Sequence, residues 1–138
     1  MDVFTWAPLQ DSVTITPKKT ISSESVLLQA KYRSGLYSYN VRTQKITSYQ
    51  RSDHPNSLTK NVITTLAIDN KKRLWVGTYG QGLCRYNDET DDFTRHDYLK
   101  LPNKIITSII PKGDLLWIST NKGLAVYNPD TEYLKTYS

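Results

Sequence analysis

The sequence predicts an all-β fold, and two observations carry that prediction. The motif Gly-Leu-x-x-Tyr-Asn occurs three times, beginning at Gly35, Gly82 and Gly123. The intervals are 47 residues (35 to 82) and 41 residues (82 to 123), a period typical of stacked supersecondary units. Short apolar runs separated by glycine, asparagine and proline fill the chain, and no segment shows sustained helical periodicity. The sequence is therefore that of a repeat protein built from strands.

The repeat extends well beyond the motif itself. Downstream of each motif a threonine and then an apolar residue recur in step: Thr43 and Ile46, Thr90 and Phe93, Thr131 and Leu134. Upstream, the segment 74–78 (LWVGT) matches 116–120 (LWIST), whereas the first copy has only the eroded segment 27–31 (LLQAK). So many aligned positions indicate one structural unit repeated three times.

Each unit reads as four short strands. In the second copy these are 63–69, 74–78, 83–86 and 93–98. Asn121-Lys122-Gly123 places glycine where a short hairpin needs a left-handed residue, and Asn128-Pro129-Asp130-Thr131 has the preferences of a type I turn. Four strands with a period of 41 to 47 residues are typical of a propeller blade. We therefore predict a partial β-propeller of three four-stranded antiparallel blades.

The first residues predict part of a further blade. Asp2-Val3-Phe4-Thr5 resembles Asp91-Asp92-Phe93-Thr94, so Phe4 is expected in the outer strand of a preceding blade. The expected division is 1–10 for that strand, 11–52 for a degenerate first blade, 53–99 for the second and 100–138 for the third, all in one propeller fragment. Propellers close with about four to eight blades. We therefore expect the remaining blades of a larger parent protein, or a second copy in a homo-oligomer, as partner.

Composition excludes several classes of protein. A chain of 138 residues with 38% hydrophobic and 22% charged residues is one ordinary globular domain. Neither a long apolar segment nor a signal peptide is visible, so we expect no membrane contact by this fragment. The net charge of +5 is scattered along the chain, which favours a solvated surface over a nucleic-acid site.

The sequence predicts no enzyme, no cofactor and no metal site. Cys84 is the single cysteine and lies among apolar neighbours, where a small buried side chain is expected. His54 and His96 form no motif with it that would predict a Cys–His catalytic pair. The acidic group at 88–92 lacks the spacing of a calcium loop and is expected at a solvated hairpin tip.

The glycine-rich segment 77–82 (GTYGQG) raises the question of a phosphate cradle. It precedes a strand rather than a helix, whose N-terminus would be needed to hold an anion, so a strand–strand turn is the better interpretation. Trp75 and Trp117 are then expected at equivalent places between neighbouring blades. Small residues beside them, Gly77 and Ser119, permit close packing of the sheets.

The second copy resembles the two-component regulator propeller repeat. The matching residues are Leu58, Asn61, Ile63, Leu66, Asp69, 74–78, Gly82, Leu83, Tyr86 and Phe93. Lys72 replaces the usual glycine, and the third copy lacks the aspartate. The resemblance implies a sensor region of a hybrid two-component regulator of Bacteroides-like bacteria, facing the periplasm. It also implies, for several members, the sensing of oligosaccharides released from glycans.

The expected ligand site follows from the blade order. One end of a propeller collects the turns between second and third strands and the connections between blades, and binding residues are common on such loops. The candidates at this end are Tyr32, Arg33, His54, Asn56, Tyr79, Gln81, Asn103, Asn121 and Lys122. Their rings, amides and cations suit sugar hydroxyls and uronate carboxylates, but they are equally ordinary turn residues. A non-catalytic oligosaccharide sensor is the leading prediction, and a protein–protein interaction scaffold without a small ligand is the alternative.

Overall fold

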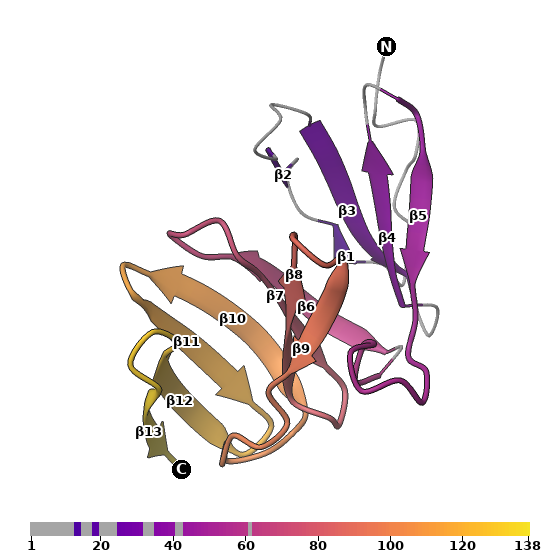
Figure 1. Cartoon of the computed structure of the whole chain (residues 1–138). Helices are drawn as coiled ribbons and strands as arrows, with labels where there is room; N and C mark the ends of the chain where they lie inside the picture. Colours follow the sequence, from indigo (N-terminus) through magenta and orange to yellow (C-terminus); the bar gives the residue numbers. More distant parts are fainter. Residues whose placement is uncertain (1–12, 15–17, 20–24, 32–34, 41–42, 61) are drawn as a thin grey trace.

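The computed structural model describes residues 13–14, 18–19, 25–31, 35–40, 43–60 and 62–138. These residues form three antiparallel sheets (Figure 1). The first sheet comprises β1 (Val13–Thr14), β2 (Lys18–Lys19), β3 (Ser25–Lys31), β4 (Gly35–Asn40) and β5 (Ile46–Tyr49). The second comprises β6 (Ile63–Ile68), β7 (Leu74–Thr78), β8 (Leu83–Asn87) and β9 (Asp92–Arg95). The third comprises β10 (Ile106–Lys112), β11 (Leu115–Thr120), β12 (Gly123–Asn128) and β13 (Tyr133–Tyr137).

The second and third sheets are simple meanders in which neighbours along the chain are neighbours in the sheet. In the first sheet, β1 and β2 pair with different parts of β3, on the edge that β6 and β10 occupy in the other sheets. Together they stand in place of one innermost strand. The eroded first copy therefore still forms a blade.

The strand registers confirm the repeat alignment. The motif tyrosine pairs with the downstream apolar residue in every sheet: Tyr39 with Ile46, Tyr86 with Phe93 and Tyr127 with Leu134. An irregularity also falls at the same repeat position of two inner strands, at Thr64 and at Thr107. The predicted partial propeller of three four-stranded blades is confirmed. The predicted strand around Phe4 lies outside the described residues, and the outer strand expected at 93–98 ends at Arg95.

The last asparagine of the motif shapes the hairpin between the third and fourth strands. The backbone N–H of Asp91 donates to Asn87 O at 2.9 Å, and that of Asp130 donates to Asn128 Oδ1 at 2.9 Å. Four residues after each asparagine the chain takes a positive φ, at Gln44, Asp91 and Glu132. The predicted turn at 128–131 is therefore one case of a hairpin that all three blades share.

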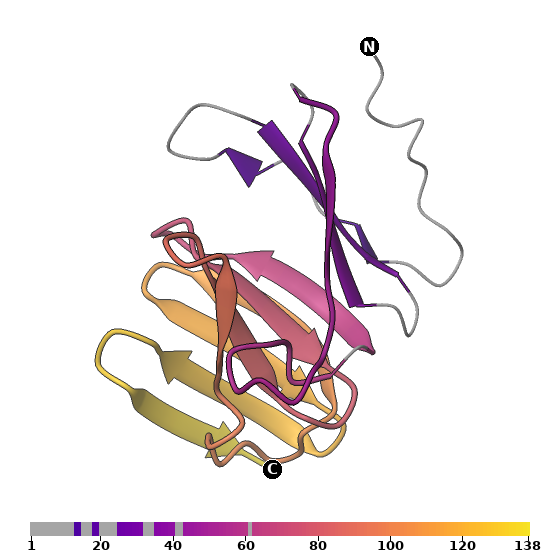
Figure 2. The same cartoon turned by 45° about the vertical axis from the view of Figure 1, so that its right-hand side comes forward.

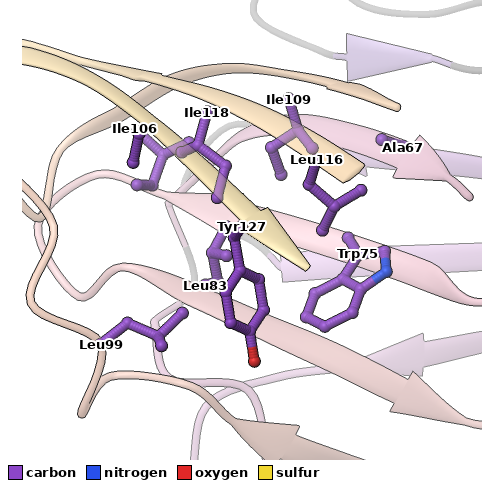
Figure 3. Close-up of a cluster of buried hydrophobic side chains, with 10 residues drawn as sticks. Ala67, Trp75, Leu83, Leu99, Ile106, Ile109, Leu116, Ile118 and Tyr127 are labelled. Atoms are coloured by element: carbon purple, nitrogen blue, oxygen red, sulfur yellow. The ribbon is translucent and has the colours of Figure 1, made fainter. Parts of the chain in front are cut away.

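The core between the second and third sheets is drawn in Figure 3. Trp75 is fully buried, and Tyr127 of the third sheet packs edge-to-face against it with ring centroids 6.2 Å apart. Ile106 of β10 reaches the middle of the second sheet, where a Cβ on Gly77 would lie 2.7 Å from Ile106 Cγ2. Only glycine lets the two sheets approach this closely. The expected role of Gly77 is thus explained by a contact across the interface.

A separate cluster joins the first sheet to the second. Leu36 of β4 and Leu58 of the connecting segment pack with Val76, Cys84 and Phe93 of the second sheet. The second sheet is therefore covered on both faces, by the first sheet on one and the third on the other. Figure 2 shows the second and third sheets stacked, with the first sheet beyond the second.

Trp117 departs from the expectation of equal placement. It occupies the same register as Trp75, since Trp75 pairs with Ala67 and Trp117 with Ile110. Trp117 is nevertheless only half-buried, and Ile110 beside it is 54% exposed. The reason is positional: within the described residues, no sheet follows the third one to cover that face.

Candidate functional site

The candidate site lies where two turns and one connection meet at the same end of the second and third sheets. The β7–β8 turn is tied to the connection that enters β10, because Gly80 N and Gly82 N both donate to Lys104 O at 3.0 Å. The β11–β12 turn joins them through Asn121 N, which donates to Ile105 O at 3.2 Å. We call this group the turn rim: Tyr79, Gly80, Gln81, Asn103, Lys104, Asn121 and Lys122.

A repeated threonine fixes both turns of the rim. Thr78 Oγ1 donates to Gly82 O and Thr120 Oγ1 donates to Gly123 O, each at 2.8 Å. The same oxygens accept from the backbone, Thr78 Oγ1 from Gln81 N at 3.1 Å and Thr120 Oγ1 from Lys122 N at 3.2 Å. The threonine that ends each Leu-Trp-x-x-Thr segment is therefore the local determinant of turn shape.

The rim presents its side chains to solvent. Tyr79 is 52% exposed, and Gln81, Lys104, Asn121 and Lys122 are also exposed. Asn103 is half-buried, and its Oδ1 accepts from Ile105 N at 2.8 Å, so its carbonyl supports the backbone. The structure thus brings together five of the predicted site residues: Tyr79, Gln81, Asn103, Asn121 and Lys122.

His54 and Asn56 do not belong to the rim. Asn56 lies beside the start of β9, where its Nδ2 donates to Asp92 Oδ2 at 3.1 Å and its carbonyl accepts from Phe93 N at 2.9 Å. The His54 carbonyl accepts from Arg95 Nη2 at 3.1 Å. The connection between the first two blades is therefore held along the outer strand. Tyr32 and Arg33, the remaining predicted residues, lie outside the described residues.

Two lysines that the sequence did not single out also lie at the rim. Lys60 Nζ is 3.2 Å from the position that a Cβ on Gly80 would take. Lys104 Nζ donates to Asp97 O at 2.6 Å, on the connection that leaves β9. The repeat held a signal for Lys60, because it stands three residues before Ile63 just as Asn103 stands three before Ile106. The backbone carbonyl of Lys104 accepts hydrogen bonds from the β7–β8 turn, and no sequence pattern predicts this contact.

A second polar network lies at the opposite end of the sheets. Asp69 Oδ2 accepts from Trp75 Nε1 at 2.9 Å and from Arg73 Nε at 2.6 Å. Arg73 Nη1 donates to Asp130 Oδ1 of the third blade at 2.9 Å. Burial acts to raise the pKa of Asp69, but the hydrogen bonds from Trp75, Arg73 and the Lys71 backbone outweigh it and lower that pKa. These side chains are hydrogen-bonded to one another and link the second blade to the third.

The nucleophile candidates are on opposite faces of the second sheet. Cys84 is fully buried against the first sheet, and burial raises the pKa of its thiol to about 11. His96 packs against Trp75 with ring centroids 5.0 Å apart, on the side of the third sheet. Within the described part of the chain, no three His, Cys, Asp or Glu side chains gather as metal ligands would. None of the described segments is a helix long and apolar enough to cross a membrane.

Residues 57–80, which run through β6 and β7 into the turn rim, match the family model described as two component regulator propeller. The chain carries a two-component regulator propeller repeat. The family recognised from Asp69 and the Leu-Trp segment is therefore confirmed.

Relatives and solved structures agree with this assignment. The histidine kinase P4 of Formosa agariphila is 33% identical over 102 residues, which is 66% of this chain and 7% of that protein. An extracellular domain attributed to a hybrid two component system of B. thetaiotaomicron superposes with a TM-score of 0.73 at 26% identity, covering 82% of this chain and 16% of that one. Another, attributed to a one component system of the same organism, gives 0.68 at 29% identity, covering 80% and 15%. The chain thus spans a small part of the proteins it matches.

Proposed function

We propose that this two-component regulator propeller segment is a non-catalytic, ligand-binding part of a sensor region, and that its ligand is an oligosaccharide derived from a glycan. The observation that carries the proposal is the turn rim itself. Its side chains are a phenol, amides and ammonium groups, which suit the hydroxyl groups of a sugar. The relatives' extracellular placement supports a periplasmic location for this segment.

The backbone of the rim is fixed by hydrogen bonds, which sets the positions from which those side chains extend. Three backbone hydrogen bonds join the β7–β8 and β11–β12 turns to one connection, and two threonines close the turns from inside. Preorganised donors lose little conformational entropy when a ligand binds. A site of this kind favours recognition by shape and hydrogen bonding.

The chemistry of the described residues supports binding rather than catalysis. The thiol of Cys84 is buried with a raised pKa, so it is protonated at neutral pH and cannot act as a nucleophile. The rim itself brings together no acid–base pair of side chains. We therefore propose that the parent protein responds to occupancy of the rim and not to turnover.

A protein-interaction scaffold is the second candidate function, and one observation favours it. The outward face of the third sheet carries large exposed side chains, including Ile110, Tyr133 and Tyr137. An exposed apolar face of this kind is typical of a protein–protein contact surface.

Thermal unfolding of the chain across an oligosaccharide panel tests the leading proposal. One sugar class should raise the melting temperature in a concentration-dependent way, because a ligand that binds only the folded state stabilises it. The control is the Gln81→Ala, Asn121→Ala double variant, which should fold but lose the shift. Equal melting temperatures across the whole panel would contradict the sensor proposal and favour the scaffold.

A further inference from the structure

The charges of the second and third blades are separated between the two ends of the sheets. From Asp53 onward the chain has ten acidic residues, and eight of them lie in or beside the turns at the end opposite the rim: Asp69, Asp88, Glu89, Asp91, Asp92, Asp114, Asp130 and Glu132. At the rim end the one carboxylate in the turns and the connection into β10 is Asp97. Asp53 is paired with Arg51 at 3.2 Å, away from the rim.

Ammonium groups gather where the carboxylates are missing. Lys60, Lys104 and Lys122 lie at the turn rim, and Lys100 lies in the same connection as Lys104. Within the described residues, none of these four side chains forms an ion pair with a carboxylate, and the amine of Lys104 contacts a backbone carbonyl. At the opposite end, by contrast, Lys71 and Arg73 are both bound to Asp130 at 2.9 Å.

This separation gives the rim a positive potential that the net charge alone does not reveal. The four lysines share one end of the two sheets, and charges are only partly screened over about one Debye length, roughly 8 Å at physiological salt. An anion placed over the rim would interact with several of them at once. Charge-assisted hydrogen bonds to carboxylate or sulfate are roughly twice as strong as neutral ones.

We propose that the ligand of the turn rim is an anionic saccharide, carrying carboxylate or sulfate groups, with Lys104 and Lys122 as the residues that select its charge. This inference rests on the proposed sensor function and makes it specific. Tyr79, 52% exposed beside the lysines, offers an aromatic face for the apolar side of a sugar ring, while Gln81 and Asn121 offer amides to its hydroxyls.

Binding to three probes of similar length tests the proposal: a neutral galacto-oligosaccharide, an oligogalacturonate and a sulfated galacto-oligosaccharide. Calorimetric titration of the full chain at low and high salt should show binding of the uronate, the sulfated probe or both, at least about tenfold tighter than the neutral one. The affinity should fall as salt rises. Backbone amide signals of residues 79–82 should shift in NMR spectra.

Lysine variants locate the effect. Lys122→Gln and Lys104→Gln should each weaken binding of the anionic probe by several-fold, and Lys122→Glu should abolish it. Lys112→Gln is the matched control, because Lys112 is also exposed but lies at the far end of β10, and it should leave the affinity unchanged. Lys122 is exposed in the β11–β12 turn, so loss of folding is not expected to obscure the result.

Failure of this inference can be distinguished from failure of the sensor proposal. Equal affinity for the neutral and anionic probes, or unchanged affinity in the rim variants, would overturn this inference and leave the sensor proposal standing. Absence of binding by every saccharide would overturn both. A single-stranded oligonucleotide of equal charge that binds as tightly as the saccharides would show nonspecific attraction of polyanions, and would also overturn the inference.

Discussion

Trp75 joins three parts of the molecule through one side chain. Its indole N–H donates to Asp69 Oδ2 at 2.9 Å, so the ring is fixed to the turn before its own strand. The ring then packs against His96 of its own blade and Tyr127 of the next. Trp117 holds the same register on the third blade but has neither that aspartate nor a covering sheet. Equivalent residues in a repeat therefore contribute unequally to stability.

Truncation of the two tryptophans should show this inequality. Trp75→Ala should lower the free energy of unfolding by about 3–5 kcal/mol, as for other fully buried large aromatics. Trp117→Ala should cost less than about 2 kcal/mol, because only part of its surface is buried. Urea unfolding of both variants, at a concentration low enough to keep the chain monomeric, measures the difference. Equal losses in the monomer would contradict the placement of Trp117 on an uncovered face.

His96 should make stability depend on pH. Burial lowers the pKa of its imidazole below the ordinary value of 6.5, and nearby Arg85 acts in the same direction. The folded state therefore binds the proton less tightly than the unfolded state, so this contribution is complete above pH 6.5 and is lost as the pH falls through the lowered pKa. The melting temperature should decline in that window. His96→Phe keeps a buried ring without the titrating group and should flatten the decline, and a decline of the same size would contradict the assignment.

At the scale of elements, the blades were predictable and the connections were not. Segments 74–78 and the Tyr–Asn hairpins recur in the sequence, and the repeat fixed both their ends and their pairing. The connection at 51–58 carries no such pattern, because its path is set by contacts with a distant strand. Arg95 alone donates to carbonyls of Ser52, His54, Ser57 and Leu58. These bonds place His54 and Asn56 along β9 rather than at the rim.

Some candidate site residues could be placed from the sequence, whereas others depend on contacts between segments that are distant in the sequence. Residues in the β7–β8 and β11–β12 turns could be placed at one end of the sheets from strand order alone. The lysine cluster could be identified only from the structure. The backbone carbonyl of Lys104 binds the β7–β8 turn, and the amine of Lys60 packs beside Gly80 of the same turn. A periodic pattern of apolar residues indicates which strand residues are buried. Contacts between two different loops produce no such periodic pattern in the sequence.

Arg95 should be the residue that holds the connection between the first two blades in place. Arg95→Lys keeps the charge but removes the planar donor group that reaches several carbonyls at once. We expect faster amide hydrogen exchange across residues 52–58 and a loss of about 1–3 kcal/mol in the free energy of unfolding, since the part-buried carbonyls of Ser57 and Leu58 lose a donor. Arg85→Lys on the neighbouring strand is the matched control, because the guanidinium of Arg85 makes only a long hydrogen bond within its own strand among the described residues, to Asn87 Oδ1 at 3.5 Å. Unchanged exchange in Arg95→Lys would show that the connection is held by other contacts.

The three sheets are stacked along the molecule. No described residues cover the outward face of the third sheet, which is the last in the stack. On the second blade, Ala67, Trp75, Leu83 and His96 are covered by the third blade. The repeat places Ile110, Trp117, Leu124 and Tyr137 at the same positions of the third blade, where Ile110 is 54% and Tyr137 47% exposed. Thr64 also donates to the carbonyl of Ile106 across the covered interface, whereas its equivalent Thr107 is exposed. The uncovered face thus carries the same kind of surface as a blade–blade contact.

We therefore expect the isolated chain to self-associate through this face, with a second copy as the simplest occupant. Repeat units bury their cores against neighbours, and an apolar face of this composition is costly to leave in water. Two chains of three blades would supply six, within the range of about four to eight in closed propellers.

Light scattering at low micromolar concentration should give the mass of a dimer. Ile110→Lys should return the mass to that of a monomer because it places a charge at the centre of the contact. Glu89→Lys, which places the same charge in the exposed β8–β9 turn away from this face, is the control that should leave the dimer intact. A monomer mass for the unaltered chain together with a single cooperative melt would exclude self-association and would assign the face to further blades of a parent protein.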